Sequence, residues 1–401
     1  MSSRYDYIVI GAGIVGLATA RAVQCARPSA RIALVEKESA VAQHQSSHNS
    51  GVIHAGVYYP PGSLKATYCR QGVAATRAFC AEHGIAHRQC GKLVVATDDV
   101  EATRLRDLAE RARQNGLDCE WLDSAGIAAR EPAVSGVAAL FVRDTGIADY
   151  PAICARLAEL FRAAGGELCL GQAVRGIAER ADGVTVEVEH GAALSADFLV
   201  VCGGLQADRL ARLAGLAVDV TIVPFRGDYY RLPATRSDIV STLVYPVPDP
   251  RLPFLGVHLT LTADGGITLG PTAMLALARE RYAKWAFDPA DTLTSLRNPG
   301  TWRLLARFPR AGLTEVAHAL SRRLYLREAR RYCPSLVLDD LAEHACGIRA
   351  QAVTRAGEMV HDFLIEQTAR SVHVLNAPSP AATSAFPIAA ALVERIAAAR
   401  A

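Results

Sequence analysis

The sequence predicts an α/β fold in which a parallel sheet is joined to an interleaved domain built on an antiparallel sheet (α+β). Alanine-rich helical stretches alternate with short β-rich runs along the chain, which is typical of parallel sheets. The runs Tyr7–Ile10, Arg31–Val35 and Asp197–Cys202 show little polar alternation, as central strands covered on both faces do. The segment Thr221–Leu269 alternates instead and turns at Ala263–Gly266, which indicates an antiparallel hairpin.

Helices over Gly13–Ala26 and Ile153–Ala164 are expected to cover the parallel sheet. In the hairpin, the run Leu255–Thr262 places its side chains alternately on two faces. We expect the apolar face to pack and the other to meet something polar. The apolar face carries Leu255, Val257, Leu259 and Leu261, and the other carries Gly256, His258, Thr260 and Thr262.

The bulk composition indicates a globular protein of two domains. The chain has 401 residues, of which 51% are hydrophobic and 21% charged. Its 43 basic and 40 acidic residues leave a formal net charge of +3, too small to attract nucleic acid over the whole surface. We assign residues 1–85, 145–220 and 333–401 to the first domain, and residues 86–144 and 221–332 to the second.

The sequence has no CxxC pair, signal peptide or candidate membrane-spanning helix, and this bears on metal binding and cellular location. The ten cysteines form no CxxC pair, so we expect them to be reduced and structural, and we predict no metal site. Met1–Asp6 lacks the features of a signal peptide, and Ser371–Val393 contains three prolines, which disfavour a membrane-spanning helix. We therefore expect a soluble, cytoplasmic protein.

A nucleotide fingerprint stands at the N-terminus. Gly11-Ala12-Gly13-Ile14-Val15-Gly16 follows an apolar strand and opens a helix, and Glu36 stands 20 residues beyond Gly16, at the end of the next strand. Gly11 permits the tight turn, Gly13 lets backbone amides approach a pyrophosphate, and Gly16 allows the helix to pack on the strand. Glu36 would accept hydrogen bonds from the adenosine ribose. We conclude that a dinucleotide binds.

Two further segments favour FAD over NAD as this dinucleotide. The polar loop His44–Gly51 directly follows the Glu36 unit and has the composition to bind a ribityl chain and pyrophosphate, although a surface loop would look similar. At the other end of the chain, Asn376–Ser384 leads into a short apolar helix, so a second helix N-terminus would face a ligand. A flavin reaches across the sheet to such a position.

Beyond these signals, six blocks of sequence resemble the L-2-hydroxyglutarate dehydrogenases and oxidases, and more widely the D-amino-acid-oxidase-like flavoproteins. The resemblance covers essentially the whole chain. The blocks are Asn49–Tyr59, Pro224–Tyr229, Tyr245–Pro248, Phe254–Thr260, Gly347–Gln351 and Asn376–Pro380.

The resemblance implies a Rossmann-like FAD-binding domain, here the first domain, and an antiparallel-sheet substrate-binding domain, here the second. It also implies oxidation of L-2-hydroxyglutarate to 2-oxoglutarate, with hydride passing from C2 to the flavin N5. A quinone or dioxygen would then reoxidise the flavin. Noncovalent FAD is favoured over attachment to His44, His48 or Cys69.

The expected contacts to FAD come from the fingerprint, the polar loop, the ends of the central strands and the C-terminal loop. They are Gly11, Gly13, Ile14, Val15, Gly16, Glu36, Lys37, Gln45, Ser46, Ser47, His48, Asn49, Ser50, Gly51, Val174, Gly203, Gly204, Gly347, Arg349, Pro378, Ser379, Pro380, Ala381, Ala382 and Thr383.

Oxidation of a 2-hydroxy acid requires a base for the hydroxyl proton and a cation for each carboxylate. His54, next to the cofactor loop, and His258, on the polar face of the hairpin, are both candidate bases, with His54 preferred. Arg226 and Arg349 are the candidate carboxylate ligands.

A regular strand would place Arg226 and Tyr229 on opposite faces, so only one of them would point at the substrate without a bulge. The second-rank substrate contacts are Tyr58, Tyr59, Tyr229, Thr260 and Lys65.

Other functions remain open from the residues alone. A glycerol-3-phosphate or amine oxidoreductase would share this fold, and a sensor would bind the dinucleotide without turnover.

Residues 303–331 contain eight arginines and two glutamates among apolar side chains. This segment is either a solvated helix face or a peripheral contact with anionic lipid at the inner face of the cytoplasmic membrane.

Overall fold

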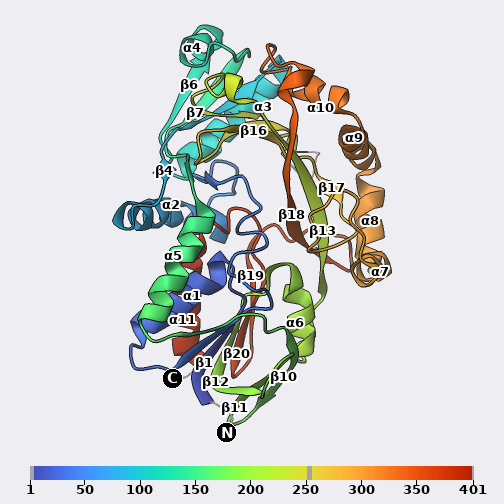
Figure 1. Ribbon diagram of the computed structural model, residues 1–401. Helices are drawn as coiled ribbons and strands as arrows, with labels where there is room; N and C mark the ends of the chain where they lie inside the picture. Colours follow the sequence, from blue (N-terminus) through green and yellow to red (C-terminus); the bar gives the residue numbers. More distant parts are fainter. Residues whose placement is uncertain (1–3, 251–254, 400–401) are drawn as a thin grey trace.

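The computed structural model describes residues 4–250 and 255–399. Phe254, from the block Phe254–Thr260, lies outside the described residues, as do Met1–Ser3 of the N-terminal segment. Two large sheets lie one above the other in Figure 1, with the chain termini below the lower one. The architecture mixes parallel and antiparallel strands, which confirms the predicted fold class.

The lower sheet has eight strands with a parallel centre. The parallel strands are, in order, β9 (Glu167–Cys169), β2 (Ile32–Val35), β1 (Arg4–Ile10), β12 (Leu194–Val201) and β20 (Ser371–Asn376). Antiparallel strands complete it: β10 (Val174–Arg180), β11 (Gly183–Val188) and β19 (Leu364–Gln367). The three predicted central strands are confirmed as β1, β2 and β12.

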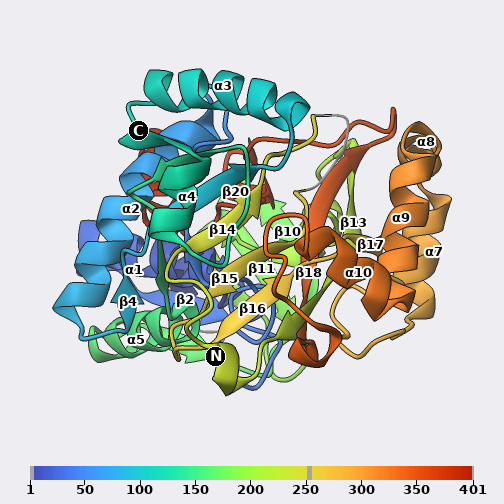
Figure 2. The ribbon, with the colours of Figure 1, turned by 90° about the horizontal axis from the view of Figure 1, so that it is seen from above.

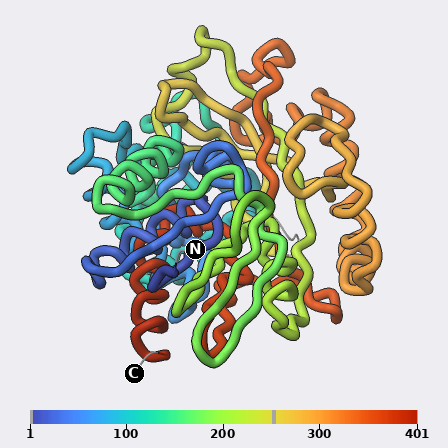
Figure 3. The backbone as a smooth tube through the Cα atoms, turned by 60° about the horizontal axis from the view of Figure 1, so that its bottom comes forward, coloured from blue at the N-terminus to red at the C-terminus, as the bar shows by residue number. Residues whose placement is uncertain are grey.

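Both faces of this sheet are buried, which explains why its strands lack polar alternation. Val9 and Leu34 pack against helices on one face, while Ile8 and Val35 belong to the core of the other face. Helices α1 (Ile14–Ala26), α5 (Tyr150–Ala163) and α11 (Ala385–Ala399) cover the first face, and α6 (Ala207–Leu213) contributes to the second. Figure 3 shows the N-terminal segment and the C-terminal helix on the same side of the molecule, where α1 packs on α11.

The upper sheet has nine strands. Its main path is β17 (Met274–Leu275), β13 (Val220–Arg231), β16 (Ile267–Gly270), β15 (His258–Leu261), β14 (Leu243–Pro246), β5 (Lys92–Ala96), β7 (Ala138–Val142) and β6 (Cys119–Asp123). The hairpin β15–β16 confirms the predicted turn, and only β14 and β5 pair in parallel among the described strand pairs of this sheet.

The ninth strand, β18 (Ala342–Thr354), pairs with β13 along nearly its whole length. This pairing joins residues 342–354 to the upper sheet, whereas the predicted division placed residues 333–401 in the first domain. The sequence of residues 342–354 does not show which of the two sheets this strand joins, because a long strand looks the same in either sheet. For the other residues, the predicted division into two domains stays a prediction.

Shorter elements connect and cover the two sheets. A small sheet combines β3 (Val52–Ile53), β8 (Gly146–Ala148) and β4 (His87–Arg88). Helices α2 (Leu64–Glu82), α3 (Asp99–Gln114) and α4 (Ser124–Arg130) lie near it and over the upper sheet. Figure 2 shows an outer layer on one side, made of α7 (Pro289–Arg297), α8 (Pro299–Arg307), α9 (Pro309–Leu320) and α10 (Arg322–Ala329). Among the described helices, none combines the length and apolar composition needed to cross a bilayer.

A buried ion pair fastens α6 to the upper sheet. The Arg279 guanidinium donates to both carboxylate oxygens of Asp208, at 2.6 and 3.0 Å, and both side chains are 0% exposed. It also donates to the carbonyl oxygens of Leu205 and Ile222, each at 2.8 Å. These bonds satisfy the two charges in an environment without water.

We predict that Arg279→Met lowers the free energy of unfolding by about 3 kcal/mol, because the buried Asp208 carboxylate loses its two bonds from Arg279 and keeps only those from the part-exposed Arg212 and the Ile222 N–H. Urea denaturation followed by circular dichroism measures the change. Arg156→Met is the control. Arg156 pairs with the exposed Glu159, so this variant should unfold at the same urea concentration as the wild type. Equal midpoints for the two variants would show that the buried pair does not hold the fold together.

Candidate cofactor and substrate site

A cavity of about 700 Å³ opens at the carboxyl ends of the central parallel strands. Ile10, Val35 and Cys202 line it where β1, β2 and β12 end. Ligands of open α/β sheets bind at this edge. The cavity continues upward to β13 and β18, where Tyr229 and Arg349 line it. Its size lies within the range of cofactor and small-molecule sites.

The fingerprint turn leaves no room for side chains. A Cβ on Gly11, whose φ is +99°, would lie 2.4 Å from the Cys202 carbonyl oxygen, and one on Gly16 would lie 1.8 Å from the Gly11 carbonyl oxygen. No side chain caps the first turn of α1 through its N-cap Gly13. Within the turn, the N–H groups of Gly11, Ala12 and Ile14 already donate to Val35, Glu36 and Ser46. The amides of Gly13 and Val15, which line the cavity, and the positive end of the helix dipole remain for a pyrophosphate.

Glu36 directly follows β2 and also shapes the turn. Its carboxylate accepts hydrogen bonds from the backbone N–H of Ala12, at 2.7 Å, and of Glu38, at 3.0 Å. Lys37 follows it and forms ion pairs with Glu38 and, at 3.2 Å, with Glu280. Both predicted residues line the cavity.

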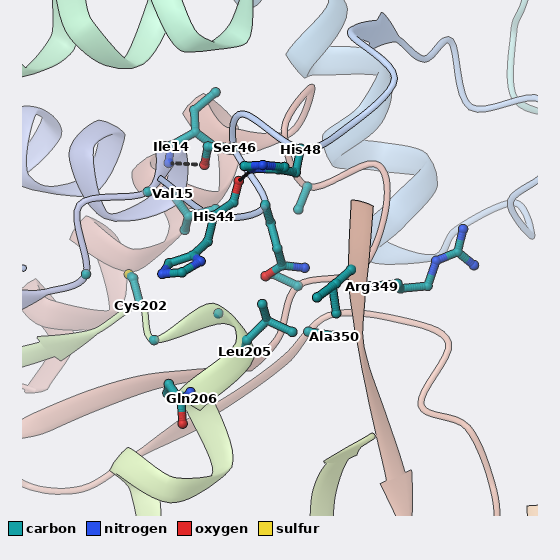
Figure 4. A pocket seen from close by; sticks show the side chains of 18 of the residues that line it. Ile14, Val15, His44, Ser46, His48, Cys202, Leu205, Gln206, Arg349 and Ala350 are labelled. Carbon is teal, nitrogen blue, oxygen red and sulfur yellow. Dashed lines mark hydrogen bonds between the residues drawn. The ribbon is translucent and has the colours of Figure 1, made fainter. Parts of the chain in front are cut away.

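The polar loop 44–51 is held by its own hydrogen bonds. The Ser46 hydroxyl accepts a bond of 2.9 Å from the Ile14 N–H, and the Asn49 amide donates to the carbonyl oxygens of Gln45 and Ser46. The His48 ring stacks on Tyr282 with 3.8 Å between centroids. Figure 4 shows His44, Ser46 and His48 around one end of the cavity, with Arg349 on the opposite side.

The C-terminal loop meets the N-terminal part of the chain at Thr383. Its hydroxyl accepts a hydrogen bond of 3.1 Å from the His54 N–H and lies 3.1 Å from the Tyr150 hydroxyl. A Cβ on Gly72 would lie 2.1 Å from the Thr383 carbonyl oxygen. This contact places His54 at the cavity wall, beside the loop that contains Pro378–Thr383.

Nearly all of the predicted cofactor residues line the cavity. The exceptions are Ser47 and Gly51. Ser47 turns its hydroxyl to the Ala42 carbonyl oxygen, and the Gly51 N–H donates to the Asn49 side chain, so both serve the loop's internal structure. Sequence reasoning missed Cys202, Leu205, Gln206 and Arg209, which also line the cavity; they directly follow β12, and the rule for strand ends could have found them.

Of the predicted catalytic and substrate residues, His54, Tyr229 and Arg349 line the cavity. Burial holds the pKa of His54 well below its usual value, and Lys92, His258, Arg349 and Lys65 lower it further. Burial likewise lowers the pKa of Lys65 to about 8, with the Arg349 charge adding to the effect. Several cationic groups thus converge on His54.

Arg226 corrects one prediction. Its guanidinium donates to Asp228, at 2.6 Å, and to the carbonyl oxygens of Tyr282 and Ala283, and it does not line the cavity. Strand alternation puts Tyr229 on the cavity side and Arg226 on the other, despite a register shift between Gly227 and Tyr229. Arg226 therefore braces the loop after β17 and lies outside the cavity lining.

His258 lies in the upper sheet, outside the cavity lining. Its ring stacks on Tyr245 with 3.8 Å between centroids, and its Nδ1 lies 2.8 Å from the Gly256 carbonyl oxygen. Burial lowers the pKa of His258 to about 3. Tyr58, Tyr59, Thr260 and Lys65 also lie outside the lining.

We predict that Gly11→Ala yields protein without bound flavin, because its Cβ would collide with the Cys202 carbonyl. Visible absorbance per polypeptide after purification measures the loss. Gly62→Ala is the matched control, since Gly62 also has a positive φ, +81°, but has open space where its Cβ would stand. Retention of flavin by Gly11→Ala at the level of this control would contradict the assigned cradle.

Comparison with known proteins agrees with this geometry. The family model described as FAD dependent oxidoreductase matches residues 6–395. The L-2-hydroxyglutarate dehydrogenase of Escherichia coli strain K12 is 47% identical over 392 residues, covering 98% of this chain and 93% of the relative. The mitochondrial L-2-hydroxyglutarate dehydrogenase of Homo sapiens is 38% identical over 412 residues, covering 98% and 89%.

Solved structures share the fold at lower identity. The FAD-bound L-alpha-glycerophosphate oxidase of Mycoplasma pneumoniae aligns with a TM-score of 0.80 at 21% identity, covering 98% of this chain and 94% of that one. The glycine oxidase of Geobacillus kaustophilus aligns with a TM-score of 0.73 at 20% identity, covering 98% and 95%. The chain therefore belongs to the FAD dependent oxidoreductase family, and within it to the L-2-hydroxyglutarate dehydrogenase family, with FAD as its cofactor.

Proposed function

We propose that this protein oxidises the C2 alcohol of L-2-hydroxyglutarate to 2-oxoglutarate. The observation that carries the proposal is the charge around His54. The cations among the groups that lower its pKa are Lys92, Arg349 and Lys65, and each of them disfavours a further positive charge. A site of this kind complements a substrate with two carboxylates. The identity to curated L-2-hydroxyglutarate dehydrogenases supports the same substrate.

The residues of the cavity fit FAD. The glycine turn and the amides of Gly13 and Val15 at the start of α1 would hold the pyrophosphate, and Glu36 would bind the adenosine ribose. Bound FAD supplies the acceptor for the two electrons of the alcohol, and a quinone or dioxygen takes them onward. The protein's own part is to bind the acid, hold its C2 in place and accept the hydroxyl proton.

His54 is the proposed base, because burial leaves its imidazole neutral at physiological pH. The carboxylates of a bound substrate would offset the neighbouring cations and so favour its protonation. Arg349 would bind the carboxylate next to the alcohol carbon with two parallel hydrogen bonds. Tyr229 lines the cavity near Arg349 and would limit the space for the substrate. Lys65 adds positive charge near Arg349.

Two other substrate classes compete on this fold. A protonated amine is disfavoured, since the same cations would repel it. Glycerol 3-phosphate is an anion and fits the charge as well as a dicarboxylate does, but the curated relatives support the dicarboxylate. A sensor without turnover would need no base poised at the cavity, and His54 stands there.

The decisive experiment is an anaerobic visible spectrum of the purified protein, titrated separately with L-2-hydroxyglutarate, D-2-hydroxyglutarate and glycerol 3-phosphate. We expect the L-acid alone to bleach the flavin band. Bleaching by glycerol 3-phosphate in place of the L-acid would reassign the substrate. A flavin that none of the three reduces would leave the cofactor site and remove the proposed activity.

We predict that His54→Ala retains FAD and loses most turnover, by about 100-fold or more, because the hydroxyl proton has no acceptor. Steady-state kinetics with an artificial acceptor and flavin absorbance measure the two effects. His87→Ala is the control, since His87 is exposed and outside the cavity. Wild-type kcat in His54→Ala would assign the base elsewhere.

The pH dependence of kcat/KM follows from the sign of the His54 shift. A lowered pKa keeps the free enzyme's imidazole unprotonated at pH values where an ordinary histidine gains its proton. We therefore expect no loss of kcat/KM as pH falls from about 8 to about 6.5. An acidic limb with its midpoint at or above the ordinary histidine pKa would contradict this.

We further propose that the outer helices rest on an anionic membrane surface, where a quinone would be reached. Trp302, Leu313 and Leu320 are 56%, 72% and 68% exposed, and arginines stand close to each of them in the sequence. The outer layer formed by α7–α10 is visible in Figure 1. Part of the basic charge is internal, because Arg331 pairs with Glu101 at 2.6 Å.

We expect the wild type to sediment with vesicles containing phosphatidylglycerol at low salt and to be released by high salt. Leu313→Gln combined with Leu320→Gln should stay in the supernatant, whereas Val100→Gln, at a 62% exposed site on α3, should bind as the wild type does. No sedimentation of the wild type with these vesicles would remove the membrane proposal.

A further inference from the structure

Lys92 is a buried cation in the upper sheet that the roles above do not use. It begins β5, and its side chain is 1% exposed. Its ammonium lies over the ring of Tyr245, 4.2 Å from the centroid, and over that of Tyr58, at 5.1 Å. No Asp or Glu of the described chain forms an ion pair with it, and the nearby thiols of Cys69 and Cys90 are protonated, because burial raises the pKa of each. An ammonium so placed destabilises a fold unless an anion joins it.

Strand register gathers further polar side chains around this lysine. Lys92 pairs with Leu243, and Val244 pairs with Leu259, so Tyr245 and His258 share the sheet face of Lys92. The hydroxyls of Tyr58, Tyr245 and Thr260 are buried without a hydrogen bond of standard geometry. The hydroxyls of Tyr245 and Thr260 act on each other, whereas that of Tyr58 has no partner among the described residues, and the Lys92 ammonium lies over the Tyr58 ring. Buried polar groups seldom lack partners, so a ligand that satisfies both Tyr58 and Lys92 fits here. We call these five residues the Lys92 cluster: Lys92, Tyr58, Tyr245, His258 and Thr260.

The Lys92 cluster lies behind the cavity wall that carries His54. None of its five residues lines the cavity, but Tyr58 and Tyr245 pack in the same apolar cluster as Val52, which does. Lys92 begins β5, whereas Arg349 lies in β18, which pairs with β13, so the two cations come from different parts of the upper sheet. Both lower the pKa of His54, and a dicarboxylate whose alcohol carbon lies at His54 could turn one carboxylate toward each of them.

We propose that Lys92 and the Tyr58 hydroxyl receive the second carboxylate of the substrate, the one remote from the alcohol, while Arg349 binds the nearer one. This inference rests on the proposed function and assigns the dicarboxylate specificity of that site. Lys65, nearer to Arg349, is the competing cation.

A pH effect follows from the geometry. Burial lowers the pKa of Lys92 to about 7, so the free site loses its ammonium as pH rises through neutrality. A carboxylate placed beside the lysine raises that pKa again. The affinity for a dicarboxylate should then fall by up to about tenfold for each pH unit above 7. The affinity for a monocarboxylate of the same length should not change, because that ligand does not bind Lys92.

The test uses two unreactive ligands on the FAD-loaded protein, glutarate and pentanoate, which differ in one carboxylate. Dissociation constants come from the change that each ligand causes in the visible flavin spectrum. Lys92→Met should weaken the binding of glutarate by about 10- to 100-fold and that of pentanoate by less than about threefold. Lys284→Met, on the protein surface, is the matched control and should change neither. Equal weakening of both ligands by Lys92→Met would overturn the inference.

Lys65→Met decides between the two cations. Selective loss of glutarate binding in Lys65→Met, together with unchanged glutarate binding in Lys92→Met, would also overturn the inference. Folding is checked by FAD content and melting temperature, and removal of an uncompensated buried charge should leave the melting temperature of Lys92→Met at or above that of the wild type.

Turnover separates this inference from the proposed function. If L-2-hydroxyglutarate reduces the flavin and Lys92→Met lowers kcat/KM equally for this acid and for L-2-hydroxypentanoate, the function stands and the inference fails. If L-2-hydroxyglutarate does not reduce the flavin but glutarate selectivity depends on Lys92, the substrate assignment fails and the dicarboxylate subsite stands.

Discussion

The pairing of β13 with β18 is the constraint on which the site depends. These two long strands belong to the upper sheet, yet their lower ends reach the parallel sheet, where Arg279 and Asp208 fasten α6 to β13. Along them, Tyr229, Gly347 and Arg349 are placed against the cofactor loop. Gly347 shows how close this approach is, since a Cβ there would lie 2.6 Å from the His48 carbonyl oxygen. A shift in register would move the substrate wall away from the flavin cavity.

Burial of cationic and basic groups accounts for most of the site's chemistry. The same desolvation that leaves His54 neutral lowers the pKa of Lys65 to about 8 and that of Lys92 to about 7. The two lysines are thereby held near a change of charge at physiological pH, whereas His54 stays neutral. An anionic substrate entering such a site gains from all of them, and it protects them from further loss of charge.

The shared fold does not decide the substrate. The glycerophosphate and glycine oxidases align with this chain at TM-scores of 0.80 and 0.73, although their names describe different substrates. The glycine turn, Glu36 and the C-terminal loop surround the cofactor end of the cavity. The side chains that β5, β14, β15 and β18 present beside His54 are where substrate discrimination would arise.

The sequence by itself determined the parts whose signals are local. The glycine turn, the strands on either side of it and the acid at Glu36 are read from adjacent residues, because a tight turn, a helix start and a strand end depend on short-range geometry. The alternation in Leu255–Thr262 likewise predicted the buried leucine face. The blocks of sequence that resemble L-2-hydroxyglutarate dehydrogenases and oxidases led to His54 and Arg349 as candidate site residues.

The tertiary structure decided which charges meet. Arg226 and Arg349 look alike as strand arginines, but the partner loop after β17 takes up Arg226 and leaves Arg349 at the cavity. Lys92 reads as the ordinary polar start of an apolar strand, and only the pairing of β5 with β14 brings it to Tyr245 and His258. Such contacts join residues far apart in the chain, and desolvation depends on everything packed around a group, so no local pattern encodes them.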